Sequence, residues 1–285
     1  MGRWVGGGAW EDGGIMSGLV ITSPSNPRIK GLAALRRRRV REESGTTLLE
    51  GYEELQLALD AGLVPRTLYW CADLMLDPRA QRALVDDVAS QGAEVVELSR
   101  AAFEKAAYRE GPDGFLAVVD QPGGDHLDLA GDAPLLLCCE HVEKPGNLGA
   151  MLRTADAAGV TGVIAADPVT DWGNPNVVRS SKGTVFSVPV ASMSTQRMVA
   201  DLRAAGVLVV AATPHTDVEH TDVHYTGPVA ILVGAEKEGL TDEALDAADV
   251  RVRIPMVGRA NSLNVATSAA IIVYEAVRQR AAARR

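Results

Sequence analysis

The last half of the chain alternates short apolar runs with longer helical patterns, and this alternation limits the possible folds more than any other feature. Between most of the runs, apolar residues recur at helical spacing, most clearly in residues 148–158 and 263–280. Repeated strand–helix alternation predicts an α/β fold, a mainly parallel sheet with helices on both faces. The predicted strands are residues 135–139, 162–166, 185–190, 207–212, 229–233 and 250–254.

The part of the chain before this region predicts a second, smaller unit. A linker is expected at residues 121–134, where glycine, aspartate and proline gather. Residues 17–120 mix helical and strand-like runs and predict a small α/β domain, and residues 135–285 form the larger domain. Residues 1–16 are rich in glycine and predict a disordered segment.

Charge is distributed unevenly along the chain. The net charge of −9 argues against a general nucleic-acid-binding protein, which is normally basic overall. Residues 28–41 nevertheless contain seven basic residues and no acidic one. Such a run could hold a phosphate backbone locally, or it could be an ordinary solvated helix face. The candidate RNA-binding residues are Arg28, Lys30, Arg36, Arg37, Arg38, Arg39 and Arg41.

Several classes of protein are excluded by missing patterns. No apolar run approaches the roughly 20 residues of a membrane helix, and no signal-peptide pattern opens the chain. Cys71, Cys138 and Cys139 have neither disulfide-framework nor metal-ligand spacing, which predicts reduced cysteines, no metal site and a cytoplasmic location. The chain also lacks a glycine-rich dinucleotide loop and a P-loop.

The first of three polar motifs follows the predicted strand 135–139 and runs from Glu140 to Arg153. Asn147 and Arg153 are six residues apart, about 240° around a helix, so they cannot share one face. We expect Asn147 in the turn or at the helix N-cap and Arg153 on the second helical turn. A plain cap and a surface arginine are the alternatives.

The second and third motifs follow two later strands. Gly234 and Glu236 come directly after residues 229–233, and a glycine there lets the backbone approach a ligand closely. Glu236 would bind that ligand or hold Arg153. In the third motif, residues 254–258 offer free backbone groups suited to an adenine edge, while Ser262 has the right chemistry to cap the helix that follows.

In this order, the three motifs resemble those of the SpoU/TrmH family of SPOUT-class RNA ribose 2′-O-methyltransferases. The resemblance covers residues 134–281 and includes Arg179 to Gly183 between the first two motifs. It implies a deep trefoil knot in the parallel sheet, S-adenosylmethionine as cofactor and a homodimer. The N-terminal module resembles, more weakly, the ribosomal-protein-like domain of members that act on large-subunit rRNA. The sequence is rich in alanine, arginine and valine, and in this it resembles the family's antibiotic-resistance members.

The resemblance also implies roles for particular residues. The positions that match the cofactor-contacting points are Gly234, Ile254 and Leu263, and Thr213 and Met256 are expected to join them. Those that match the polar catalytic set are Asn147, Arg153, Glu236, Ser262 and Asn264. The expected function is 2′-O-methylation of a nucleotide in 23S rRNA, with antibiotic resistance as a further expectation. A tRNA methyltransferase of the same family and a non-catalytic RNA-binding protein are the alternatives.

Overall fold

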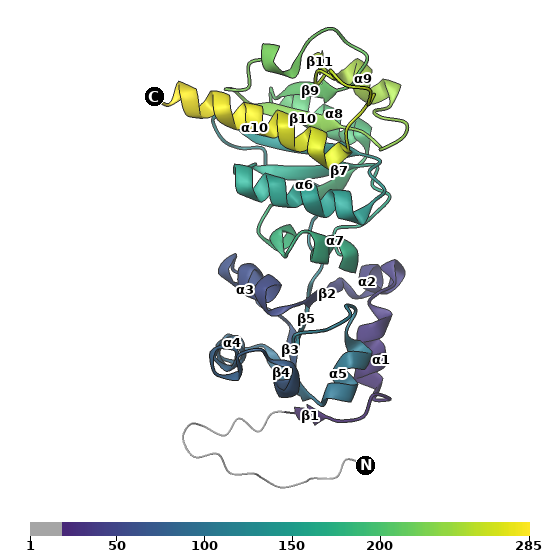
Figure 1. The fold of residues 1–285 in the computed structure, drawn as a ribbon, viewed down its shortest axis with the longest axis vertical. Helices are drawn as coiled ribbons and strands as arrows, with labels where there is room; N and C mark the ends of the chain where they lie inside the picture. The colour runs from purple at the N-terminus through teal and green to yellow at the C-terminus, as the bar shows by residue number, and fades with distance from the viewer. Residues whose placement is uncertain (1–18) are drawn as a thin grey trace.

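A computed structural model describes residues 19–285, so the predicted disordered segment 1–16 lies outside the described residues. The described chain forms two sheets, one above the other along the long axis of the molecule (Figure 1). Residues 19–120 supply the first sheet and residues 135–252 the second. The division between them is therefore also a division along the chain.

The second sheet has six strands in the order β11-β9-β10-β6-β7-β8, and every neighbouring pair is parallel. Because all strands run the same way, the loops that follow them emerge at one edge. This confirms the predicted parallel α/β sheet. The strands are β6 Leu135–Glu140, β7 Gly162–Ala166, β8 Val190–Met193, β9 Leu208–Ala212, β10 Val229–Val233 and β11 Val250–Val252.

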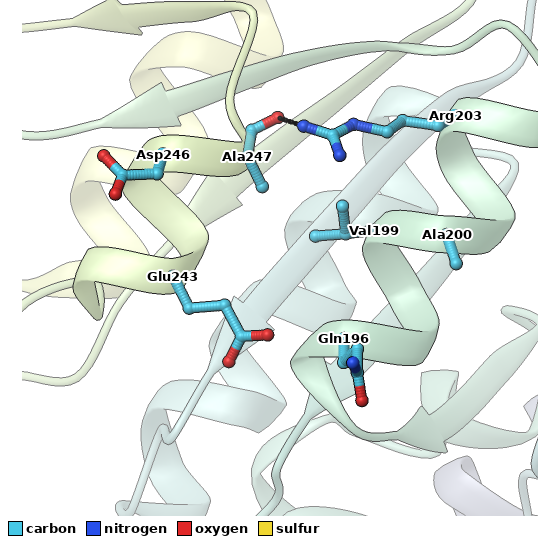
Figure 2. Close-up of a pocket in the computed structure, with 7 residues that line it drawn as sticks. All are labelled: Gln196, Val199, Ala200, Arg203, Glu243, Asp246 and Ala247. Carbon is cyan, nitrogen blue, oxygen red and sulfur yellow. Dashed lines mark hydrogen bonds between the residues drawn. The ribbon is translucent and has the colours of Figure 1, made fainter.

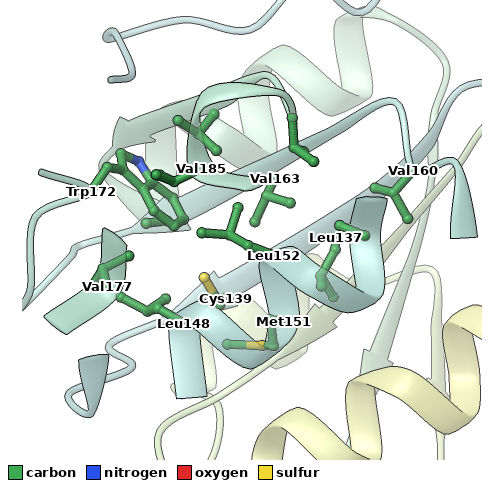
Figure 3. Packing of buried hydrophobic residues seen from close by; sticks show 14 of the residues in the cluster. Leu137, Cys139, Leu148, Met151, Leu152, Val160, Val163, Trp172, Val177 and Val185 are labelled. Atoms are coloured by element: carbon green, nitrogen blue, oxygen red, sulfur yellow. The ribbon is translucent and has the colours of Figure 1, made fainter. Parts of the chain in front are cut away.

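Helices cover both faces of this sheet because alternate strand residues point to opposite sides. Leu137 and Cys139 pack with α6 (Pro145–Ala158) and α10 (Val265–Ala283) on one face. Leu136 and Cys138 pack with α8 (Thr195–Ala204) and α9 (Asp242–Ala247) on the other. Figure 3 shows the first face, with Leu148, Met151 and Leu152 of α6 against the sheet. The fully buried cysteines are free thiols, and burial raises the pKa of Cys139 to about 12.

The prediction of a strand at residues 185–190 was wrong for most of its length. Gly183 has a φ of 84° and opens the 3₁₀ turn η2 (Thr184–Phe186), so β8 begins only at Val190. A positive φ suits glycine, because it has no Cβ. The α6 helix also starts earlier than predicted, since Pro145 is well tolerated in a first turn. The trefoil knot stays a prediction.

The first sheet has five strands in the order β1-β4-β3-β5-β2. β1, β4 and β3 are parallel, while β5 runs antiparallel to both β3 and β2. Its strands are β1 Leu19–Ile21, β2 Thr46–Glu50, β3 Thr67–Trp70, β4 Glu94–Leu98 and β5 Phe115–Asp120. Its helices are α1 Pro27–Ala34, α2 Arg38–Ser44, α3 Tyr52–Asp60, η1 Ala72–Leu74, α4 Pro78–Ser90 and α5 Arg100–Ala106.

The two sheets are joined through the segment between β7 and β8, which carries α7 (Pro175–Ser180). Figure 1 shows α7 at the junction, and it packs against β2. Thr47 of β2 donates a 2.5 Å hydrogen bond to the carbonyl of Gly173. Buried apolar side chains continue from Leu49 to Val177 and Val178 in one cluster. The junction is therefore packed like an interior.

A buried ion pair crosses the same junction. The Arg41 side chain donates to both carboxylate oxygens of Asp171, at 3.1 and 2.5 Å, and to the carbonyls of Leu35 and Arg36, each at 3.0 Å. Arg41 is 0% exposed. The prediction that Arg41 binds RNA was therefore wrong, because its guanidinium is enclosed and its donors are engaged within the protein.

Two further properties concern the described residues. No helix among residues 19–285 combines the length and apolarity needed to cross a bilayer. Within the same range, no three or more His, Cys, Asp or Glu side chains gather in an arrangement that could hold a metal ion.

We predict that Arg41→Gln lowers the free energy of unfolding by about 3–5 kcal/mol, because the change leaves the Asp171 carboxylate buried without its charge partner. Urea denaturation measures this loss. The matched control is Arg39→Gln. Arg39 also pairs with an acid, Glu43, but its side chain is 88% exposed, so the loss should stay below about 1 kcal/mol. Equal losses in the two variants would contradict the structural role of Arg41.

Candidate functional site

The candidate site lies where the loops after β6, β10, β9 and β11 leave the carboxyl edge of the second sheet. β6 and β10 are neighbours at the centre, with Cys139 opposite Val233. After β6 the chain continues to β7 and β8 on one side of β6, whereas the later strands β9, β10 and β11 lie on the other side of β6. Ligands of open α/β sheets bind at such a reversal of strand order, outside the carboxyl ends.

Two side-chain hydrogen bonds join the three motifs at this edge. Asn147 Nδ2 donates to Glu236 Oε1, and Asn264 Nδ2 donates to Asn147 Oδ1 at 3.1 Å. The partners are 89 and 117 residues apart in the chain. The carboxylate accepts only, so it orients the Asn147 amide, whose oxygen then faces Asn264. Three predicted catalytic residues from three loops thus form one connected chain.

Asn264 has a second role at the start of α10. Its side-chain oxygen accepts from the backbone N–H groups of Ala266 and Thr267, at 3.0 and 3.3 Å. Asn264 is therefore the N-cap residue. The prediction that Ser262 caps this helix was wrong, because α10 begins at Val265 and Ser262 stands two residues before the cap position. The Ser262 side chain is exposed.

Gly234 is required by the shape of the loop itself. A Cβ at this position would collide with the backbone of Gly239 and Leu240. Ala235 and Gly239 close the loop with reciprocal backbone hydrogen bonds of 3.0 and 3.1 Å. The close approach expected at Gly234 is therefore made by the protein's own backbone, and it fixes the turn that carries Glu236.

Arg153 lies apart from the connected chain of side chains. It is exposed on the third turn of α6, one turn later than predicted, because α6 begins at Pro145. Among the described residues it forms no ion pair, and Glu236 bonds to Asn147. Of the two roles predicted for Glu236, holding Arg153 was therefore wrong, and binding a ligand stays a prediction. The Arg153 guanidinium remains available to a ligand.

The predicted cofactor residues surround the same edge. Thr213 follows β9, and its N–H donates to Val252 of the neighbouring strand at 2.9 Å. Across residues 254–263, no backbone hydrogen bond to another described backbone group forms. Met256 and Leu263 are 37% and 39% exposed in this segment. Free amides beside partly exposed apolar side chains suit a ligand with both a heteroaromatic and an apolar part.

Sequence reasoning missed the structural importance of Glu140. Its carboxylate is fully buried at the end of β6, where it accepts from the hydroxyls of Thr195 and Thr241, at 2.7 and 2.8 Å, and from the Thr241 N–H at 2.8 Å. It thereby ties β6 to the starts of α8 and α9. The sequence did contain a signal for this role: Glu140 is an acidic residue directly after the apolar run 135–139, a position that favours a buried, hydrogen-bonded carboxylate.

A cavity of about 400 Å³ lies elsewhere, between α8 and α9 (Figure 2). Its walls include Gln196, Val199, Glu243 and Asp246, and Arg203 donates to the Ala247 carbonyl at its rim. No predicted cofactor or catalytic residue lines it. This cavity is therefore a competing location for a small ligand, and the connected side chains at the carboxyl edge argue against it.

Several basic side chains in the run at residues 28–41 already have partners within the protein, so fewer of them are free to bind RNA than the charge of the run indicates. Arg28, Arg38 and Arg39 each pair with a glutamate. Arg36 donates to the carbonyls of Ala106 and Ala107. Lys30 and Arg37 form no ion pair with any residue in the range 19–285, and both are exposed. The exposed pairs of Arg28, Arg38 and Arg39 are weak, so RNA binding by the run, apart from the buried Arg41, stays a prediction.

Comparison with known proteins identifies the class. The profile described as "SpoU rRNA Methylase family" matches residues 134–274, and the profile described as "MRM3-like substrate binding domain" matches residues 26–117. The chain belongs to the SpoU rRNA methylase family. The family resemblance inferred from the three motifs is thus confirmed.

Individual relatives match over most of their length. The 23S rRNA (uridine(2479)-2′-O)-methyltransferase of Streptomyces viridochromogenes is 35% identical over 88% of this chain and 89% of its own. RlmP of Bacillus subtilis, a 23S rRNA (guanosine(2553)-2′-O)-methyltransferase, is 31% identical over 89% and 97%. The crystal structure of AviRb from Streptomyces viridochromogenes in complex with AdoMet has a TM-score of 0.79 at 33% identity, covering 90% of this chain and 100% of its own.

We predict that Asn264→Ala lowers the free energy of unfolding by about 0.5–2 kcal/mol, because it removes the cap of α10. Ser262→Ala, two residues earlier, should leave stability nearly unchanged. Thermal denaturation compares the two. Asn264→Asp should retain the cap while losing the bond to Asn147, which separates the two roles. A larger loss for Ser262→Ala than for Asn264→Ala would overturn the cap assignment.

Proposed function

We propose that this protein transfers a methyl group from S-adenosylmethionine to the ribose 2′-hydroxyl of one nucleotide in 23S rRNA. The observation that carries the proposal is the hydrogen-bonded chain from Glu236 through Asn147 to Asn264, which holds three loops around one strand edge. Relatives that match about 90% of the chain are 23S rRNA 2′-O-methyltransferases.

The cofactor would be held mainly by backbone groups at this edge. The unbonded amides and carbonyls of residues 254–263 would meet the adenine, with Ile254, Met256 and Leu263 beside it. Thr213 and the turn after Gly234 would border the remainder. When bound, S-adenosylmethionine supplies a methyl group made electrophilic by its positive sulfonium. The fit rests on free polar backbone beside apolar side chains.

The protein's own side chains would position the ribose and ease the loss of its proton. Proximity would make the main contribution to catalysis, because correct placement of two reactants can lower the activation barrier by about 7–11 kcal/mol. Asn147 and Asn264 keep the loops in place, and Ser262 would contact the substrate from its exposed position. Arg153 would stabilise the developing alkoxide, and the hydroxyl proton would pass to a neighbouring RNA phosphate oxygen or to water. Arginine is a poor general base, since its pKa exceeds about 12.

The N-terminal domain favours rRNA over the tRNA alternative. It forms a complete five-stranded domain of its own and matches a substrate-binding profile. RNA is read mostly at unstacked nucleotides, so the target base would be splayed from a loop. The reaction takes place, we infer, in the cytoplasm, where the three free cysteines stay reduced.

A homodimer would bury the outer face of α6 and α10. α10 exposes Tyr274, with Ile271 half-buried beside it one turn earlier, and α6 adds the small side chains of Ala150 and Ala157. An exposed aromatic residue is a frequent interface anchor, because tyrosine is enriched in the buried centres of interfaces.

Tyr274→Glu should shift the protein from dimer to monomer in sedimentation velocity, because the new carboxylate would be desolvated in the interface. Leu76→Glu is the matched control, since Leu76 is an exposed leucine of the N-terminal domain. A wild-type protein that sediments as a monomer at micromolar concentration would contradict the dimer.

The reaction is tested by methyl transfer from labelled S-adenosylmethionine to large-subunit rRNA, small-subunit rRNA and tRNA. The modified position is mapped by its alkali-resistant linkage. One resistant site in large-subunit RNA is the expected result. A resistant site in tRNA would favour the alternative substrate, and absence of both transfer and cofactor binding would favour a non-catalytic RNA-binding protein.

We predict that Arg153→Ala slows transfer at least about 100-fold, the usual effect of removing one group that stabilises a developing oxyanion. Cofactor affinity, measured by calorimetry, should stay within about twofold. Arg197→Ala on α8 is the control, since that arginine is also exposed but lies on the other face of the sheet. Near-normal transfer by Arg153→Ala would remove Arg153 from the mechanism.

A further inference from the structure

A narrow cleft lies at the junction of the two domains. β2 and the loop after α5 form one wall, and α7 forms the other, with Leu48, Glu50, Tyr108, Arg109, Val178 and Arg179 among the lining residues. Its internal volume is about 10 Å³, room for about one water molecule. A nucleobase cannot enter it. A ligand would instead lie along its mouth.

The mouth of this cleft is basic. Arg179 is exposed near the end of α7, and within residues 19–285 its side chain forms no ion pair or hydrogen bond. Arg36 lies over the Tyr108 ring, with its Cζ 5.5 Å from the ring centre. Arg109 stands beside Tyr108, only loosely paired with Asp113 at 3.5 Å. Arg109 and Arg179 thus line the cleft from the two domains, and Arg36 stacks on the ring of Tyr108, which also lines it.

The acidic groups near the mouth are directed toward the protein. Glu50 accepts from the N–H groups of Tyr108 and Arg109, at 2.9 and 3.2 Å. Burial raises the pKa of this carboxyl. Asp113 accepts from the Tyr52 N–H at 3.0 Å. Backbone amides therefore occupy the carboxylates. Arg36 donates to the carbonyls of Ala106 and Ala107, and Arg109 pairs with Asp113. Among the three arginines, Arg179 alone forms no side-chain hydrogen bond or ion pair with any residue in the range 19–285.

Contacts lead from this cleft to the candidate catalytic site. Ser180, next to Arg179, donates a 3.1 Å hydrogen bond to the carbonyl of Pro145, in the same helical turn as Asn147. Gly149 packs so closely on Ser180 that a Cβ would collide with it. Arg153 follows Gly149 by one helical turn. Arg179 and Arg153 therefore belong to adjoining surfaces of two helices in direct contact.

We propose that the mouth of the cleft binds the RNA phosphate backbone next to the target nucleotide, with Arg179 as its principal contact. The proposal rests on the proposed function and names the route of the RNA between the two domains. An arginine fork matches the geometry of a phosphate and forms strong charge-assisted hydrogen bonds. This site shares only Arg36 with the basic run at residues 28–41, and it needs both domains in their observed arrangement because Arg109 and Arg179 come from different domains.

The test uses the full-length protein and a large-subunit rRNA fragment containing the mapped methylation site. Fluorescence anisotropy gives the affinity at several salt concentrations. Arg179→Gln should weaken binding about tenfold, as expected for a hydrogen bond to a charged group. It should also reduce the slope of log K against log salt by about 0.7–0.9, the value for one phosphate contact. Arg179→Lys keeps the charge and should retain the slope.

Two controls separate this contact from a structural role. Arg197→Gln, on the other face of the sheet, should leave affinity and slope unchanged, and all variants should keep the wild-type melting temperature because Arg179 is exposed. S-adenosylmethionine affinity should also be unchanged. If the wild-type protein methylates the RNA but Arg179→Gln binds it with unaltered affinity and slope, the cleft proposal fails alone. If the wild-type protein neither binds nor methylates the RNA, the proposed function fails as well.

Discussion

The candidate site depends on the side-chain amide of Asn147. Its nitrogen donates to Glu236 and its oxygen accepts from Asn264, so one residue on α6 fixes the loop after β10 and the start of α10. Each loop alone has many conformations, and ordering a residue costs about 1–2 kcal/mol of entropy. A connected amide and carboxylate network fixes all three loops before a ligand arrives, and such preorganisation strengthens binding.

Buried charged side chains also hold separate parts of the chain together, over whole domains and helices. Arg41 and Asp171 join the two domains, and Glu140 joins β6 to the starts of two helices. An enclosed charge requires its partners in a defined geometry, because leaving it unpaired is costly. The relative position of the domains is thereby specified, and the cleft beside Arg179 has a fixed shape.

Local pattern predicted most of the second sheet, because parallel strands buried on both sides have continuous apolar runs, as in β7 and β10. It failed at residues 185–190, where the positive φ of Gly183 opens a turn. The three motifs could be assigned to one edge because each directly follows a predicted strand of a parallel sheet. The partners of their residues could not, since Arg41 and Asp171 meet across 130 residues and nothing local distinguishes Arg41 from its exposed neighbours.

The location of the cofactor is the central claim, and hydrogen–deuterium exchange tests it directly. Adding S-adenosylmethionine should slow amide exchange in residues 234–240 and 254–264. Both segments lie at the carboxyl edge, and residues 254–263 hold backbone N–H groups that form no bond to another described backbone group. Residues lining the cavity between α8 and α9, such as Gln196 and Glu243, should be unaffected. Protection confined to α8 and α9, with unchanged exchange in residues 254–264, would contradict the account.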